Sequence, residues 1–133
     1  MRQSDVDEVM ASDGLSPLSA LEIAFKASSE AWAGLIDGVV VCMFGVCPVS
    51  LLSSEGSPWM LGSDDIEQHQ KLFLRRCRPV VAGMARSYKS LHNHVDCRNE
   101  TSIRWLKWLG FTMGEPEPYG IFGLPFRRFW LES

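Results

Sequence analysis

The sequence lacks the features that mark membrane, secreted and zinc-binding proteins. The longest apolar run near its middle, Val39 to Phe44, is far too short to cross a membrane. Its four cysteines form no C-x-x-C pair, which favours reduced, buried thiols over a disulfide framework or a zinc site. The acidic N-terminus, MRQSDVDEVM, differs from a signal peptide, which begins with basic and then apolar residues. We therefore expect a soluble intracellular protein with no membrane partner.

No internal repeat or low-complexity linker divides the chain. Of its 133 residues, 46% are hydrophobic and 22% are charged, which suits one globular domain with a core of its own. We expect this single domain to span residues 1–133, with residues 1–14 as a loosely attached N-terminal segment.

The charges are distributed unevenly along the chain. The net charge is only −3, but nine of the 13 lysines and arginines fall between Lys71 and Lys107. This local basic excess would suit either an anionic ligand or a solvated helix face. The acidic balance of the whole chain disfavours nucleic acid as a partner.

The first half of the chain predicts a helix followed by a hairpin. In SPLSALEIAFKASS, Ser16 suits the N-cap and Pro17 the first helical position, and a further helical turn is expected around DVDEVMAS. Two valine-rich runs flank Asp37-Gly38, which predicts a two-residue hairpin turn because both turn positions need a positive φ. The range 49–52 is a possible end of the second strand, and WML predicts a short third strand.

The second half predicts a long helix and a strand with one polar face. GSDDIEQHQKLFLRRCRPVVAGMARSYK begins at a plausible N-cap, Ser63, and Pro79 must kink or divide the helix. LHNHVD alternates, which places His92, His94 and Asp96 on one side of a strand. After the next helix come FTMG, a proline-rich break EPEPYG and a last strand FRRFWL. This order of elements predicts a mixed sheet with helices against it.

The stretch NETSIRWLKWLGF predicts a helix that is capped at both ends. Asn99 is a favoured N-cap residue, and Glu100 and Arg104 form an i,i+4 pair in the better orientation. Gly110 suits the left-handed position after the helix, which would let Phe111 fold back in a Schellman closure. The stretch is therefore a self-contained helix of about three turns.

The same stretch carries a resemblance to a known family. Asn99, the small residue Ser102 and the pair Gly110-Phe111, directly after a strand, are similar to the N-x-x-A … G-F segment of GNAT-type acyl-CoA N-acetyltransferases. PWMLGSDDI, FLRR and NHVDCRNETSIRWLKWLGF more closely resemble the small GNAT-like proteins of short-tailed phages, a group that includes internal virion proteins. The resemblance covers residues 15–131.

The resemblance implies an α+β fold with a mixed, mostly antiparallel sheet, splayed central strands and helices on both faces. The first strand of the family would be short or missing here. It also implies that the pantetheine arm of acetyl-CoA lies in the splay, hydrogen-bonded to the strand that contains WML. The cofactor-binding residues implied in this way are Trp59, Met60, Leu61, Gly62, Ser63 and Asn99.

The sequence departs from the family's pattern at two places. The turn GSDDIEQ supplies three carboxylates where the family cradles a pyrophosphate, and each unit-charge contact there would cost on the order of 1 kcal/mol. Leu106 stands where many GNAT enzymes have the tyrosine that protonates the leaving thiolate, so Tyr119 is the better substitute for it. An N-cap role explains Asn99 as well as contact with the cofactor does.

Acetyl transfer to an amine needs a base whose pKa lies near the working pH. His92, His94 and Asp96 are the candidates on the polar strand face, with His92 deeper in the strand. Histidines hydrogen-bonded at a sheet edge are the alternative interpretation, and a metal site with Cys97 lacks a fourth ligand at a convincing spacing. The predicted catalytic residues are His92, Asp96 and Tyr119, with no metal.

The tryptophans divide into two groups. Trp105, Trp108 and Trp130 are most simply explained by packing of helix against sheet, whereas Trp32 and Trp59 could line the cleft. An exposed aromatic cluster would instead suit a docking surface.

Several functions therefore remain open on the sequence alone. The first is a phage-encoded acetyl-CoA-dependent N-acetyltransferase that acts on a bacterial host protein or a small amine in the host cytoplasm. The second is a catalytically degenerate scaffold that binds a host protein, and the third is a structural component of the virion, which rests on analogy alone. A homodimer is possible in each case.

Overall fold

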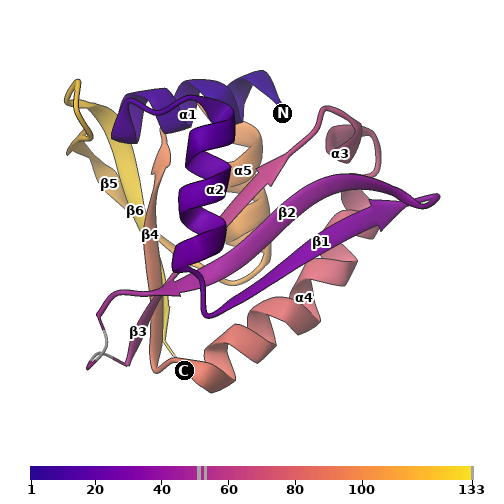
Figure 1. The fold of residues 1–133 in the computed structure, drawn as a ribbon. Helices are drawn as coiled ribbons and strands as arrows, with labels where there is room; N and C mark the ends of the chain where they lie inside the picture. The colour runs from indigo at the N-terminus through magenta and orange to yellow at the C-terminus, as the bar shows by residue number, and fades with distance from the viewer. Residues whose placement is uncertain (51, 53, 133) are drawn as a thin grey trace.

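The fold is organised around a sheet whose two central strands run parallel and diverge. Within the part of the chain that the computed structural model describes, residues 1–50, 52 and 54–132, the sheet has six strands in the order β1-β2-β3-β4-β6-β5. All neighbouring strands are antiparallel except β3 and β4 (Figure 1). The strands are β1 (Glu30–Ile36), β2 (Val39–Pro48), β3 (Glu55–Gly62), β4 (Ser90–Asp96), β5 (Thr112–Tyr119) and β6 (Leu124–Glu132).

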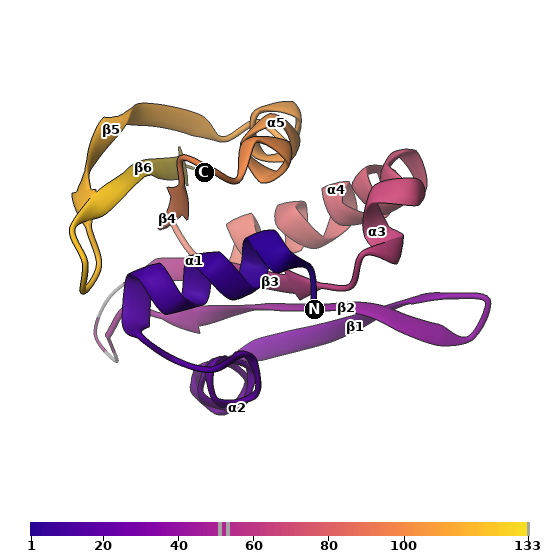
Figure 2. The same ribbon diagram turned by 90° about the horizontal axis from the view of Figure 1, so that it is seen from above.

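Helices cover both faces of the sheet. Figure 2 shows α2 on one face of β1 and β2 and α4 on the opposite face. The chain enters the sheet only after two helices, so the described residues contain no strand before α1. The predicted α+β fold class, with a mixed, mostly antiparallel sheet and helices on both faces, is confirmed. The helices are α1 (Gln3–Asp13), α2 (Pro17–Ala27), α3 (Asp65–Gln68), α4 (Gln70–Ser87) and α5 (Glu100–Trp108).

The central strands β3 and β4 part after two pairs of residues. They are paired only at Glu55–Ser90 and Gly56–Leu91, and β3 continues to Gly62 without a partner on that side. Pro58 lies in this unpaired part of β3, where its lack of an N–H removes no sheet hydrogen bond. The two strands therefore form a splay that other groups must fill.

The core lies on both sides of the splay. One cluster packs α4 and α5 against β4 and β6, and a second packs α3 and α5 against β2. Because α5 contributes to both clusters, it fixes the two diverging halves of the sheet relative to each other. The buried residues of the clusters are Val46, Met84, Leu91, Val95, Ile103, Phe111 and Phe129 in the first, and Val41, Cys42, Ile66 and Trp105 in the second.

The local predictions for the first half hold. Ser16 caps α2 by accepting a hydrogen bond from the Ser19 N–H at 3.3 Å. Asp37 and Gly38 both have positive φ, 50° and 78°, as a type I′ turn between β1 and β2 requires. The N-terminal helical turn is a full helix, α1, and Arg2, Asp5 and Ala11 are at most 2% exposed, so residues 1–14 pack closely on the rest of the domain.

The long helix is divided at a different place from the one predicted. Its interruption is at His69, whose φ is −121°, between the short α3 and α4. Helix α4 continues through Pro79 instead, with that residue exposed to solvent. The N-cap of α3 is Asp64 rather than Ser63, and it makes no side-chain capping bond. Backbone carbonyls at 63 and 64 accept the first N–H groups, which explains why no side-chain cap is needed.

Two strands extend further than the sequence predicted. The WML segment lies in the second half of the eight-residue β3, whereas β2 ends at Pro48; of the range 49–52, position 51 lies outside the described residues. The proline-rich stretch EPEPYG is no break, because β5 runs through Pro116 and Pro118 to Tyr119. Strand β5 lies at the edge of the sheet, where prolines are tolerated since one side of the strand has no partner.

Helix α5 is capped at both ends as predicted. Asn99 accepts the Ser102 N–H at 3.3 Å, and Gly110, with φ 103°, is followed by the Schellman bond from the Phe111 N–H to the Leu106 carbonyl at 3.0 Å. No ion pair joins the predicted partners at 100 and 104 among the described residues. Trp108 is 46% exposed under the guanidinium of Arg78, so its assignment to the core was wrong.

The described residues contain no helix that is both long and apolar enough to span a membrane.

Two glycine-to-alanine variants test the closure of α5 by opposite effects. Gly110→Ala should destabilise the fold by about 1–2 kcal/mol, because a Cβ there meets no atom within 4 Å and the cost is that of the positive φ alone. Gly83→Ala, inside α4 and free of close contacts, should stabilise it by about 0.5–1 kcal/mol. Urea unfolding measures both, and equal effects of the two variants would contradict the assigned conformation of Gly110.

Candidate functional site

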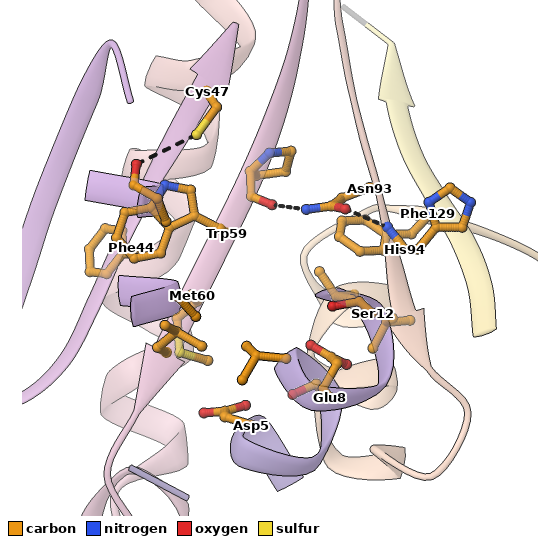
Figure 3. Close-up of a pocket in the computed structure, with 18 of the residues that line it drawn as sticks. Asp5, Glu8, Ser12, Phe44, Cys47, Trp59, Met60, Asn93, His94 and Phe129 are labelled. Carbon is orange, nitrogen blue, oxygen red and sulfur yellow. Dashed lines mark hydrogen bonds between the residues drawn. The ribbon is translucent and has the colours of Figure 1, made fainter. Parts of the chain in front are cut away.

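A cavity of about 440 Å³ lies in the splay between β3 and β4. Its lining comes from α1 and α2, from strands β2 to β6, and from α4 and α5. Figure 3 shows Asp5 and Glu8 of α1 on one side of it and Trp59 and Met60 of β3 on the other. Apolar side chains form most of the wall, so the few polar groups decide its chemistry. The polar lining residues with titratable or amide groups are Asp5, Glu8, Asp13, Asn93, His94 and Tyr119.

The backbone of β3 presents alternate residues to the splay. The backbone N–H and C=O groups of Trp59 and Leu61 point toward β2, whereas the backbone groups of Pro58, Met60 and Gly62 point away from β2, into the splay. Asn93 of β4 crosses the gap and donates its Nδ2 to the Pro58 carbonyl at 2.8 Å. Among the described residues, the N–H and C=O of Met60 face the cavity without a protein partner, as an extended ligand requires.

The backbone N–H and C=O of Gly62 are both hydrogen-bonded to residues at the start of α1. The Arg2 N–H donates to the Gly62 carbonyl at 2.6 Å, and the Gly62 N–H donates to Asp5 Oδ2 at 2.9 Å. Asp5 also accepts two hydrogen bonds from the Arg2 guanidinium, at 2.8 and 3.1 Å. Two hydrogen bonds therefore fasten the first turn of α1 to the end of β3, and the Arg2–Asp5 pair braces that turn internally.

Glu8 is a carboxyl group held against the end of β4. Its Oε1 accepts the Asp96 N–H at 2.8 Å, and the group lines the cavity. Burial raises the pKa of Glu8 to about 7, although hydrogen bonds from the Asp96 N–H and the Asn99 side chain act in the opposite direction. A carboxyl group with this pKa exchanges a proton near neutral pH, as a general base must.

His94 and Tyr119 form a stacked pair on the cavity wall. Their ring centroids are 3.9 Å apart at an interplanar angle of 8°, and His94 Nε2 lies 3.5 Å from a Glu117 carboxyl oxygen. Burial lowers the pKa of His94, partly opposed by Glu117, and raises the pKa of Tyr119, to which Asp13 adds. At neutral pH the imidazole is therefore uncharged and the phenol carries its proton.

The structure separates the predicted catalytic residues. Tyr119 lines the cavity, whereas His92 lies outside the lining, with its Nε2 3.8 Å from a Glu55 carboxyl oxygen. Asp96 is 2% exposed and accepts hydrogen bonds from the Arg98 side chain, the shortest at 2.6 Å, and from the Arg98 N–H. This ion pair gives Asp96 a structural role at the turn from β4 to α5.

The predicted cofactor residues are also found in different environments. Trp59, Met60 and Leu61 line the cavity, although the Trp59 indole N–H is bonded to Ser28 at 2.6 Å. The Ser63 hydroxyl is buried and has no hydrogen-bond partner among the described residues. Asn99 uses its oxygen as the cap of α5 and its amide near Glu8, so both ends of this side chain are engaged.

The structure also shows the environments of the remaining aromatic and metal-binding candidates. Trp32 stacks on Phe44 at 5.7 Å and does not line the cavity. No group of three or more potential metal ligands occurs in the part of the chain that the structure describes. All four cysteines are free, and burial raises the pKa of the Cys77 thiol to about 12. The Cys77 thiol is therefore protonated at neutral pH.

Sequence reasoning missed the contribution of α1. Asp5, Glu8 and Ser12 recur at offsets of three and seven, which places them on one helical face, and all three line the cavity. This polar stripe was present in the acidic N-terminus, but its role became clear only when the helix was seen across the splay. His94 rather than His92 meets Tyr119, because β5 ends at Tyr119 near the Asp96 end of β4, and His94 is the nearer of the two to that end.

No protein-family model and no curated protein sequence matches this chain. Solved structures do resemble it. A GNAT-family acetyltransferase from Streptococcus pneumoniae superposes with a TM-score of 0.68 at 10% identity, covering 84% of this chain and 74% of the other. The Salmonella typhimurium protein yncA with its cofactor acetyl-CoA gives 0.67 at 17% identity over 86% and 70%. Spermidine N-acetyltransferase from Vibrio cholerae, in complex with CoA and spermine, gives 0.63 at 11% identity over 86% and 71%.

At these identities the likeness establishes the fold alone. The element order, the parallel pair within an otherwise antiparallel sheet and the cavity in the splay all agree with it. The chain has the fold of the GNAT-family acetyltransferases.

Proposed function

We propose that the protein transfers an acyl group, in the simplest case acetyl, from a pantetheine thioester such as acetyl-CoA to an amine. One observation carries this proposal: the unpaired N–H and C=O of Met60 face a cavity in the splay of a GNAT-type sheet. A polar, extended arm would complete the hydrogen bonds that this part of β3 lacks. Structural neighbours that contain acetyl-CoA or CoA support the choice of donor.

The residues present fit the arm of such a donor better than its diphosphate. Met60 supplies a backbone donor and acceptor, and the buried Ser63 hydroxyl has no hydrogen-bond partner among the described residues. At the start of α3, however, Asp64, Asp65 and Glu67 would face the diphosphate, and like charges in that position repel it. We therefore expect CoA to bind through its arm, with little affinity from its phosphates.

The cavity residues supply the two proton transfers that amide formation needs. Bound in the splay, the thioester would provide an acyl carbon for attack by the amine. Glu8 takes the proton that the amine nitrogen loses as the C–N bond forms. Tyr119, protonated at neutral pH, gives its proton to the sulfur as the C–S bond breaks, and the stacked His94 ring holds the phenol in place.

The acceptor proposed here is an amine on a bacterial host protein or a small cationic amine. Asp5, Glu8 and Asp13 give the α1 side of the cavity an acidic character that suits a positively charged amine. The Vibrio cholerae neighbour, a spermidine N-acetyltransferase, supports a small amine. The sequence resemblance to phage proteins supports a host protein, encountered in the host cytoplasm or delivered from the virion.

A second candidate function is a scaffold that binds a host protein without catalysis. One observation favours it: α2 exposes Leu18, Ile23 and Phe25 at 66%, 56% and 55%. Large exposed side chains on one helix are typical of a protein-binding surface. The absence of a tyrosine at position 106, where Leu106 lines the cavity, agrees with lost chemistry.

Binding of acetyl-CoA distinguishes the two functions. Acetyl-CoA at millimolar concentration should raise the thermal midpoint, because a ligand at 100 times its Kd stabilises the native state by about 2.7 kcal/mol. Adenosine 3′,5′-bisphosphate, which has the phosphates but no pantetheine arm, serves as the control and should have no effect. If acetyl-CoA and S-acetylpantetheine leave the midpoint unchanged both in the native protein and in a folded Asp5→Ala variant, which frees the Gly62 N–H, the acyltransferase proposal fails and the scaffold remains.

The pKa of Glu8 predicts a pH dependence of stability that needs no substrate. A carboxyl group whose pKa rises to about 7 on folding takes up a proton between about pH 4.5 and 7, so its contribution to native stability falls as the pH rises through that window. Glu8→Gln keeps an acceptor for the Asp96 N–H and should be more stable than the native protein above pH 7, by about 3 kcal/mol at most.

The matched control is Glu22→Gln, the same change on an exposed face of α2. Urea unfolding from pH 4.5 to 8 should give this control the pH profile of the native protein. If the Glu8→Gln and native profiles run parallel across the window, Glu8 does not titrate near pH 7 and cannot be the proposed base.

A further inference from the structure

The Arg2 side chain lies where a cofactor-binding turn begins, and it is entirely buried. Only 1% of the residue is exposed, and the guanidinium contacts two carboxylates, Asp5 at 2.8 Å and Glu67 at 3.2 Å. It also donates to the Ser102 hydroxyl at 3.0 Å and lies over the Trp105 ring, 5.0 Å from its centroid. A single side chain thus joins the starts of α1, α3 and α5.

This arrangement occupies the backbone hydrogen-bonding groups at the end of β3. Gly62 is the last splay-facing residue of the strand, and its N–H and C=O are bonded to Asp5 and Arg2. An extended arm that ran along β3 from Met60 toward α3 would need the same two groups. Each backbone N–H provides one hydrogen, so the N–H cannot serve the arm and Asp5 together.

We propose that the first turn of α1 is an autoinhibitory plug that occupies the place of the donor's arm. In this arrangement Arg2 and Asp5 must leave Gly62 before a pantetheine thioester can bind along β3. The inference rests on the proposed function, because it names the step that controls access to that site. The plug also accounts for Glu67, which holds Arg2 at the point where a diphosphate would have to pass.

The residues that form the plug favour its release from Gly62. Helices usually dock through apolar side chains, but the turn that touches Gly62 buries an ion pair of its own, Arg2–Asp5, against the protein. The desolvation of such a pair cancels much of its attraction, so the closed contact adds little net stability. Further along α1, Ala11 is 2% exposed and Glu8 is bonded to Asp96, which provides an attachment about which the first turn can move.

The test opens the plug without changing the net charge. The double variant Arg2→Met/Asp5→Ala removes one charge of each sign and leaves Gly62 without its carboxylate acceptor. It should bind S-acetylpantetheine, an uncharged probe, at least tenfold more tightly than the native protein by isothermal titration. Hydrogen exchange at the Gly62 amide should be at least tenfold faster in the unliganded variant, which confirms that the contact has been lost.

A milder variant covers the case in which the double variant does not fold. Glu67→Gln removes one partner of Arg2 at a residue whose side chain is half exposed and leaves the Arg2–Asp5 pair intact. It should bind S-acetylpantetheine severalfold more tightly than the native protein. Gln3→Ala, an exposed change in the same helical turn, is the control and should leave the affinity unchanged.

A further variant separates the plug from simple charge repulsion. Asp64→Asn/Asp65→Asn should strengthen binding of acetyl-CoA but not of S-acetylpantetheine, which carries no phosphate. The plug is overturned if the native protein and Arg2→Met/Asp5→Ala bind S-acetylpantetheine equally well, and the acyltransferase proposal then stands. If an opened, folded variant binds neither thioester, the proposed function fails, and the plug has no ligand to exclude.

Discussion

The divergence of β3 from β4 is the constraint on which the rest of the structure depends. Beyond the pair Gly56–Leu91 each strand has backbone donors and acceptors that no neighbouring strand can satisfy. Side chains take the place of the missing strand: Asn93 bonds to the Pro58 carbonyl, Asp5 to the Gly62 N–H, and Glu8 to the Asp96 N–H. The splay is therefore held open by polar contacts from both sides. Among the described residues, these contacts leave the backbone N–H and C=O of Met60 without a protein partner.

Helix α1 acts as a partial substitute for a strand, because three of its residues supply bonds that a neighbouring strand would otherwise make. Arg2, Asp5 and Glu8 reach both diverging strands from one helical face. Their burial has a cost that is offset only while every member of the network is paired. The same desolvation raises the pKa of Glu8 to about 7, so the network that bridges the splay also tunes the group that we propose as the base.

Sequence patterns predicted the parts of the fold that short-range physics determines. The turn at Asp37-Gly38 and the caps of α5 at Asn99 and Gly110 follow from local conformational preferences, and each was predicted correctly. The role of α1 depends on contacts between residues 57 to 100 positions apart, for which no periodic signal exists. Alternation placed His92 and His94 on one face, but only the register of β4, β6 and β5 decides which of them meets Tyr119.

The capped helix that carries the family resemblance is a poor guide to activity, because its geometry serves packing. Asn99 caps α5 and contacts Glu8, Trp105 supports Arg2, and Leu106 fills the wall of the cavity. Each of these roles persists whether or not a thioester binds. In the proposed mechanism the state of Gly62 does depend on a ligand, since its two backbone groups, bonded to residues at the start of α1, are those that an arm along β3 would need. The proposed activity would therefore be decided at the end of β3, by the competition between the protein's own first helical turn and the donor.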